Sequence, residues 1–82
     1  KGVQDYITIL DFPPTFGFDE RAWSFLKKFP KLYWLQINSP KGITLPNSAY
    51  PSLRVVGIDT FQTVSKVDIR KTFPAVEICE IG

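Results

Sequence analysis

At 82 residues the chain forms one domain at most, and it has no apolar run long enough to span a membrane. Ten basic and eight acidic residues leave a net charge of +2 without a concentrated basic stripe, which argues against a nucleic-acid or membrane partner. The chain has no histidine, the commonest general base and metal ligand, and its single cysteine excludes an internal disulfide and fits an intracellular protein, cytoplasmic or nuclear.

The first two predicted elements are a strand and a helix. Residues 3–12 are rich in β-branched and aromatic side chains, which predicts a strand that Pro13 and Pro14 end. After Gly17 the pattern predicts a helix over residues 19–28 with Asp19 as its cap. The apolar side chains of this helix, expected to face the core, are Ala22, Trp23, Phe25, Leu26 and Phe29.

The later connections differ from each other. Residues 39–48 contain too many turn formers for a helix and are expected to be extended or irregular. Residues 63–72 predict a short helix, capped by Ser65 or Thr63. Its expected apolar side consists of Val64, Val67 and Ile69.

Three stretches, residues 29–37, 50–58 and 73–81, share one pattern. Each contains an aromatic residue, Pro, any residue, Leu or Val, two free positions, an apolar residue, one free position and Ile. Residues 5–12 fit the pattern as a divergent fourth copy without the aromatic-Pro start. The order of elements predicts an α/β fold with about four parallel strands and right-handed crossovers. Residues 1–82 then form a single repeat domain or a fragment of a longer array, with approximate units 5–28, 29–49, 50–72 and 73–82.

The pattern Leu32-x-x-Leu35-x-Ile37, repeated at 53–58 and 76–81, resembles the strand motif of the leucine-rich repeat superfamily. The return segment through Ile43 and Leu45-Pro46 is also similar to the return segments of that superfamily. The resemblance covers residues 5–82 and implies a short solenoid with helical or irregular return segments. In its irregular unit length and its strand cysteine, the chain resembles the intracellular, F-box-associated members of the superfamily more than the extracellular members. Where the family has an Asn or Cys at the turn, this chain has Pro40 and Phe61.

Parallel stacking of the copies predicts which residues share a sheet face. The first, fourth and sixth apolar positions turn inward, so Cys79 is expected to be a buried structural cysteine. The third, fifth and seventh positions face the concave sheet surface. These rows are Ile9, Trp34, Val55 and Ile78; Asp11, Gln36, Gly57 and Glu80; and Pro13, Asn38, Asp59 and Gly82.

An apolar row beside an acidic and polar row is typical of a protein-binding strip. We therefore expect a non-enzymatic protein-interaction module without metal or cofactor, whose partner carries Arg or Lys around an apolar centre. The predicted partner-binding residues are Trp34, Val55, Ile78, Ile9, Gln36, Asp11, Asp59 and Glu80.

Two alternatives stay open at this stage. A second layer of structure covers the apolar row in one of them, because parallel sheets are usually covered on both faces. In the other, the chain is a structural or assembly segment whose C-terminal edge strand, residues 76–81, is completed by further repeats or by another chain. An exposed ion pair between Arg54 and Glu77 is expected in either case.

Overall fold

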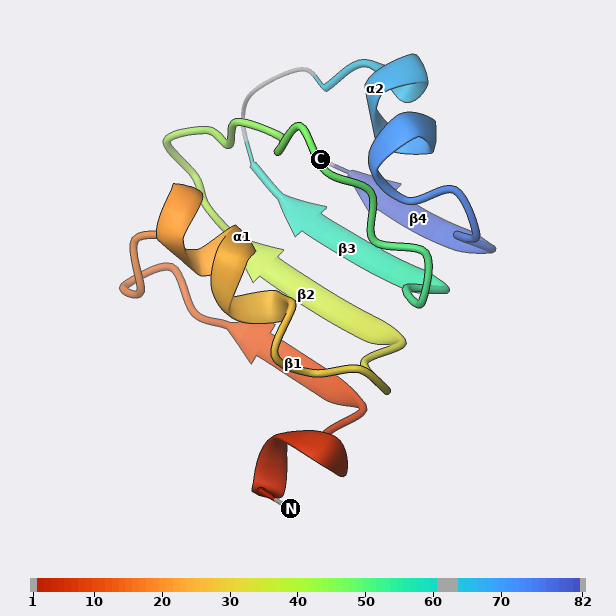
Figure 1. Ribbon diagram of the computed structural model, residues 1–82. Helices are drawn as coiled ribbons and strands as arrows, with labels where there is room; N and C mark the ends of the chain where they lie inside the picture. The colour runs from red at the N-terminus through yellow and green to blue at the C-terminus, as the bar shows by residue number, and fades with distance from the viewer. Residues whose placement is uncertain (1, 61–63, 82) are drawn as a thin grey trace.

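The computed structural model describes residues 2–60 and 64–81, which form a small α/β domain (Figure 1). In chain order its elements are the 3-10 helix η1 (Val3–Asp5), β1 (Ile9–Phe12), α1 (Glu20–Leu26), β2 (Trp34–Asn38), β3 (Val55–Asp59), α2 (Lys66–Thr72) and β4 (Ile78–Ile81). The four strands form one parallel sheet in the order β1-β2-β3-β4, so each strand pairs with the next one along the chain.

The strands pair in the register that the sequence predicts. Ile9 lies opposite Trp34, Trp34 opposite Val55, and Val55 opposite Ile78. Like positions of the shared motif therefore stand side by side across the sheet, which confirms the third-position row.

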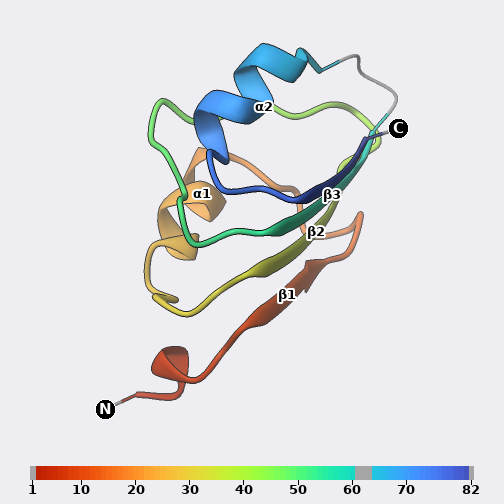
Figure 2. The ribbon, with the colours of Figure 1, turned by 90° about the vertical axis from the view of Figure 1, so that its right-hand side faces the viewer.

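The connections between strands all lie on one side of the sheet. Figure 2 shows α1, α2 and the irregular segment 39–54 on the same face, with the other face free of helices in the described chain. Connections that cross over with one hand place every return on the same side of a sheet. The covered face holds the core, whose most deeply buried strand residues are Leu35, Ile37, Val56 and Ile58.

The aromatic-Pro start of the shared motif encodes a turn. Proline stands at the second position of each turn, where its fixed backbone angle is favourable. The aromatic residue before it is buried in every case, so each turn places a ring in the core just before the next strand begins. Backbone hydrogen bonds of 3.1–3.3 Å close the turns, donated by Leu32 to Phe29, by Leu53 to Tyr50 and by Val76 to Phe73.

The first helix forms where the sequence predicts it but is shorter than residues 19–28. The Asp19 carboxylate accepts hydrogen bonds from the backbone N–H groups of Arg21 and Ala22, at 2.9 and 3.3 Å. The hydrogen bond from the Arg21 side chain is the main reason that the pKa of Asp19 is lowered. Trp23 is buried as expected. The prediction that Phe25 faces the core is wrong, since 42% of its surface is exposed and its ring packs edge-on against Phe29.

The second helix is capped by Ser65, whose hydroxyl accepts a 3.2 Å hydrogen bond from the Val67 N–H, while Thr63 lies outside the described residues. Ile69 is buried, but Val67 is 62% exposed, so its assignment to the apolar side is wrong. Both residues fit an apolar pattern by type, but the short helix turns only one of them to the sheet. Residues 39–48 form neither helix nor strand, as predicted.

The predicted strand over residues 3–12 is also corrected. Only Ile9–Phe12 is extended in the sheet, whereas Val3–Asp5 form the 3-10 helix, closed by a 2.9 Å hydrogen bond from the Tyr6 N–H to the Val3 carbonyl. The register of β1 with β2 begins at Ile9 opposite Trp34, and the backbone hydrogen bonds from Tyr33 and Trp34 end at the Thr8 carbonyl, so Val3–Asp5 have no strand partner to hold them extended.

Candidate functional site

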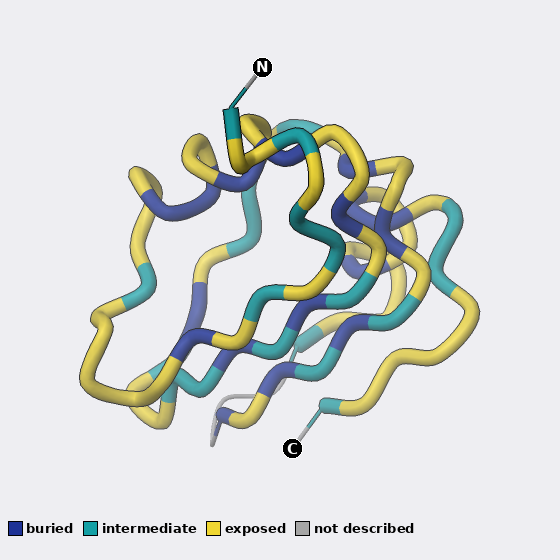
Figure 3. The backbone as a smooth tube through the Cα atoms, turned by 90° about the horizontal axis from the view of Figure 1, so that it is seen from below, coloured by how far each residue is buried: buried dark blue, intermediate teal, exposed yellow. Residues whose placement is uncertain are grey.

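All eight predicted partner-binding residues lie on the face of the sheet opposite the helices. We call this surface the open face and define it by Ile9, Asp11, Trp34, Gln36, Asn38, Val55, Gly57, Asp59, Ile78 and Glu80. Figure 3 shows the alternation of buried and less buried residues along the strands that separates this face from the core. No helix of the described chain covers it (Figure 2).

An apolar row crosses the open face near the beginning of the strands. Its outer members, Ile9 and Ile78, are 53% and 54% exposed. Trp34 and Val55, between them, are half-buried. The second layer that the sequence left open as an alternative is therefore not present over this row among the described residues, and the row forms a continuous apolar stripe across four strands.

A polar row runs beside the apolar one. The Asn38 side-chain amide donates to the Asp11 carboxylate at 3.3 Å and to the Phe12 carbonyl at 2.9 Å, which ties the end of β2 to the end of β1. The Gln36 amide in turn donates to the Asn38 side-chain oxygen at 3.5 Å. Asn38 was not among the predicted binding residues, although its seventh position in the motif placed it on this face.

Gly57 leaves a hollow in the polar row. The hollow has a volume of about 290 Å³ and is lined by Gln36, Gly57, Ile58, Asp59, Glu80 and Ile81. A Cβ atom at Gly57 would collide with the amide oxygen of Gln36, so the Gln36 side chain lies directly across the glycine. The carboxylates of Asp59 and Glu80 border the hollow and are exposed.

The open face differs in charge from the rest of the molecule. The four strands carry three acidic residues, Asp11, Asp59 and Glu80, and no Lys or Arg, whereas the rest of the chain has ten basic and five acidic residues. A chain with a net charge of +2 therefore presents an acidic sheet face. Such an arrangement attracts cationic groups to one side of the protein.

No protein-family model, no curated protein and no solved structure matches the chain.

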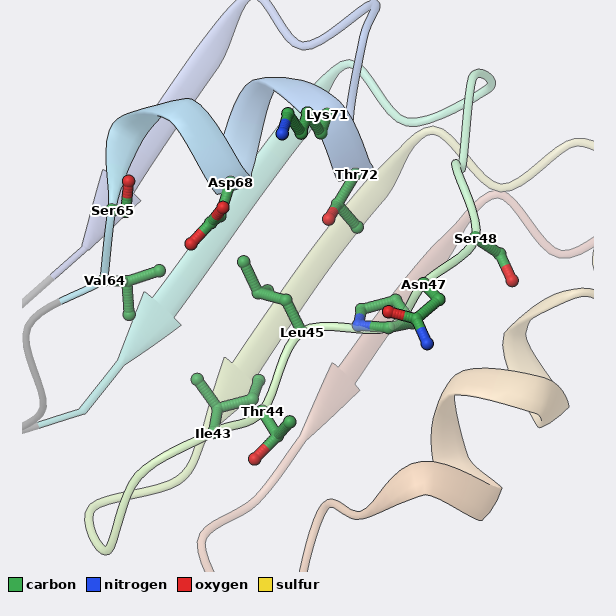
Figure 4. Close-up of a pocket in the computed structure, with 11 residues that line it drawn as sticks. Ile43, Thr44, Leu45, Asn47, Ser48, Val64, Ser65, Asp68, Lys71 and Thr72 are labelled. Atoms are coloured by element: carbon green, nitrogen blue, oxygen red, sulfur yellow. The ribbon is translucent and has the colours of Figure 1, made fainter.

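Two further hollows flank the irregular connection on the helical side. One, of about 540 Å³, lies between residues 43–48 and α2 with the preceding Val64 and Ser65 (Figure 4). The other, of about 610 Å³, lies between the same connection and the start of α1. Within residues 2–60 and 64–81, no three His, Cys, Asp or Glu side chains are placed to hold a metal ion, and no helix is long and apolar enough to cross a membrane.

The prediction that Cys79 is buried is wrong. Its side chain turns to the covered face like Leu35 and Val56, but those residues are 0% and 1% exposed whereas Cys79 is exposed. The reason is its position in β4, the edge strand, which has no neighbouring strand on its outer side among the described residues. Partial burial raises the pKa of the Cys79 thiol, which disfavours the reactive thiolate.

The predicted ion pair is present. The Arg54 guanidinium lies 2.8 Å from the Glu77 carboxylate, linking the residues just before β3 and β4. Both side chains are more than half exposed, so the pair contributes at most about 1 kcal/mol.

Proposed function

We propose that the chain is a non-enzymatic protein-interaction module that binds a protein partner through the open face. The observation that carries this proposal is the apolar row, which spans all four strands on a face without helices and is exposed by more than half at both ends. Continuous exposed apolar patches on small proteins commonly mark interaction sites. Half-buried Trp34 supplies the rigid aromatic anchor that dominates many interfaces.

The charge of the open face supports a partner of particular chemistry. Because Asp11, Asp59 and Glu80 stand without a basic residue on these strands, we expect Arg or Lys side chains around an apolar centre on the partner. The hollow at Gly57 has room for one such side chain beside the Glu80 carboxylate.

The resemblance to leucine-rich repeats supports the same proposal. Parallel strands with every return on one side are the arrangement that a short, concave solenoid requires, and such solenoids bind proteins through the strand face. Where the family has an Asn or Cys this chain has Pro40, and the turn is closed instead by the Ser39 hydroxyl, which donates to the Gly42 carbonyl at 2.6 Å. An exposed free thiol at Cys79 fits the intracellular setting that we propose.

The test places a photo-crosslinking amino acid at Ile78 on the open face and, as a matched control, at Val67 on α2. Both side chains are more than half exposed, at 54% and 62%, and they lie on opposite sides of the sheet. We expect a specific protein adduct from position 78 in cells and none from position 67. The purified adduct partner should then bind the Trp34→Ala variant at least about tenfold more weakly, as expected for an anchor worth more than 1.4 kcal/mol.

Two results would contradict the proposal. One is an equal adduct pattern from both positions, which would mean non-specific contact. The other is unchanged affinity of the folded Trp34→Ala variant, as judged by circular dichroism, for the protein captured at position 78.

A further inference from the structure

The hollow between α2 and the irregular connection has the size of a small-molecule site. We call it the α2 pocket: residues 43–48 form one wall, and Val64, Ser65, Asp68, Lys71 and Thr72 form the other. Its volume of about 540 Å³ lies within the range of roughly 300–1,000 Å³ that is typical of ligand pockets. The pocket is on the helical side of the sheet, so it is separate from the open face (Figure 2).

Thr72 contributes a hydroxyl group that has no protein partner. The residue is 4% exposed, yet no group of the described residues forms a hydrogen bond with its hydroxyl. No side-chain oxygen that is completely enclosed lacks a partner in the described chain, so this hydroxyl still reaches open space. Figure 4 shows it directed from α2 toward Leu45. Because buried polar groups are normally hydrogen-bonded, the hydroxyl is available to pair with a ligand.

Two opposite charges stand at the mouth of the pocket without pairing to each other. Asp68 and Lys71 are one turn apart on α2, and both are exposed. Neither forms an ion pair or a side-chain hydrogen bond with any residue of the ranges 2–60 and 64–81. Side chains three positions apart on a helix are neighbours. One small ligand can therefore contact both charges if it carries a positive and a negative group close together.

The space below these charges is apolar. Leu45 and Val64 are half-buried and pack against the core. Figure 4 shows the side chains of Asp68 and Thr72 directed from α2 into the space above them. The part of a ligand that extends away from its charged groups therefore contacts aliphatic side chains, which favours an aliphatic group there.

Hydrogen bonds hold the connection in position as a wall of the pocket. The Tyr50 N–H donates to the Thr72 carbonyl at 2.7 Å, which ties the connection to the end of α2. On its other side, the Trp23 indole donates to the Thr44 carbonyl and the Lys27 ammonium donates to the Ser48 hydroxyl, both at 2.9 Å. A wall that is already in place lowers the cost of ordering the site when a ligand binds.

The hollow beside α1 does not offer the same combination of groups. Its buried indole, that of Trp23, already donates to the Thr44 carbonyl. The Asp19 carboxylate accepts hydrogen bonds from the backbone N–H groups of Arg21 and Ala22 and from the Arg21 guanidinium. These polar groups are used within the protein, whereas those of the α2 pocket are not.

We propose that the α2 pocket binds a small zwitterion of the aliphatic α-amino-acid class. The ammonium group of the ligand pairs with the Asp68 carboxylate, and the ligand carboxylate pairs with the Lys71 ammonium. The Thr72 hydroxyl donates to the same ligand carboxylate. The aliphatic side chain of the ligand lies against Leu45 and Val64. This binding activity goes beyond the proposed function of the open face and does not depend on it.

The test titrates the isotope-labelled chain with L-leucine and follows the backbone amide signals by NMR. L-Leucinamide, which lacks the carboxylate, and N-acetyl-L-leucine, which lacks the ammonium group, are the matched control probes. We expect saturable shifts from L-leucine at residues 43–48 and 64–72, with a dissociation constant of about 1 mM or lower. Each control probe should bind at least about tenfold more weakly, because one charged contact is missing.

Three results of this titration would overturn the proposal. One is the absence of saturable shifts at residues 43–48 and 64–72. Another is equal affinity for L-leucine and either control probe, which would show that the ligand is not recognised as a zwitterion. The third is saturation confined to residues beside α1, which would place the binding in the other hollow.

Variants at the mouth of the pocket test the two charged contacts separately. Asp68→Asn and Lys71→Gln should each weaken L-leucine binding at least about tenfold. The matched controls outside the pocket, Asp5→Asn and Arg70→Gln, should leave it unchanged. Thr72→Val, checked for folding by circular dichroism, should also bind more weakly, since it loses the hydroxyl. If this buried variant does not fold, the two exposed variants still decide: unchanged affinity in both would overturn the proposal.

Discussion

The two faces of the sheet are made by alternate residues of the same strands, yet they are packed very differently. Leu35 and Val56 on the covered face are 0% and 1% exposed, whereas Ile9 and Ile78 on the open face are exposed by more than half. Both faces carry apolar side chains, so apolar character alone does not separate core from surface. What separates them is the side on which the helices and connections lie (Figure 2). We therefore expect stability to depend on one face and binding on the other.

The largest contrast is expected between adjacent residues of β2. Leu35→Ala should lower the free energy of unfolding by about 2–5 kcal/mol, because it leaves a cavity in the core. Gln36→Ala, on the open face, should change it by no more than about 0.5 kcal/mol. Urea denaturation followed by circular dichroism measures both. Similar losses from the two variants would show that the faces are not distinct in packing.

The next effect concerns Tyr50, whose hydroxyl donates to the Trp23 carbonyl at 2.7 Å inside the core. Tyr50→Phe leaves that carbonyl without its donor and should cost about 1–3 kcal/mol. Burial also raises the pKa of Tyr50 above its ordinary value of 10.0. The stability that the protonated Tyr50 hydroxyl contributes through this raised pKa is thus complete below pH 10 and is lost as the pH rises through the folded-state pKa.

Tyr33→Phe is the control for this effect, since Tyr33 is 43% exposed. Unfolding curves at neutral pH and above pH 10 should show a smaller alkaline loss in Tyr50→Phe than in the wild type or Tyr33→Phe. An alkaline loss of equal size in all three proteins would rule out Tyr50 as its source.

A smaller effect is expected at the hollow of the open face. Gly57→Ala places a methyl group where the Gln36 side chain lies, and that flexible side chain has to move. We expect a change in unfolding free energy within about 1 kcal/mol, because Ala is also better than Gly inside a strand. In the Gln36→Ala background the same substitution should be stabilising. A double-mutant cycle measures the coupling, and additive effects would contradict the contact.

The smallest effect is expected for the ion pair before β3 and β4. Arg54→Ala, Glu77→Ala and the double variant should give a coupling energy below about 1 kcal/mol at low salt. The coupling should decrease further in 0.5 M NaCl, at roughly a 4 Å screening length. A coupling that is independent of salt would mean that the pair is shielded from solvent.

Much of the fold was predictable because the motif marks equivalent points in successive strands. Aligning residues 29–37, 50–58 and 73–81 predicts the parallel pairing and its register, since like positions must stand side by side. The side-chain cap at Asp19 predicts the start of α1 in the same local way. The eight candidate binding residues share one face for the same reason, because side chains alternate along strands.

Other features depend on what lies next to a residue, which its local sequence does not specify. Cys79 occupies an inward position, yet it is exposed because β4 has no neighbour on its outer side among the described residues. Val3–Asp5 precede the β-branched and aromatic run that begins at Tyr6, but they have no strand opposite them. The choice between an open and a covered apolar row likewise required the placement of the helices in three dimensions.

The two tryptophans of the chain lie on opposite sides of the sheet, and this gives the protein two separate optical reporters. Trp23 is 3% exposed in the aromatic core, where its indole N–H donates to the Thr44 carbonyl at 2.9 Å. Its emission follows unfolding. Trp34 is half-buried on the open face, so quenching by acrylamide reports whether that face is occupied. A Trp23→Phe variant would isolate the second signal.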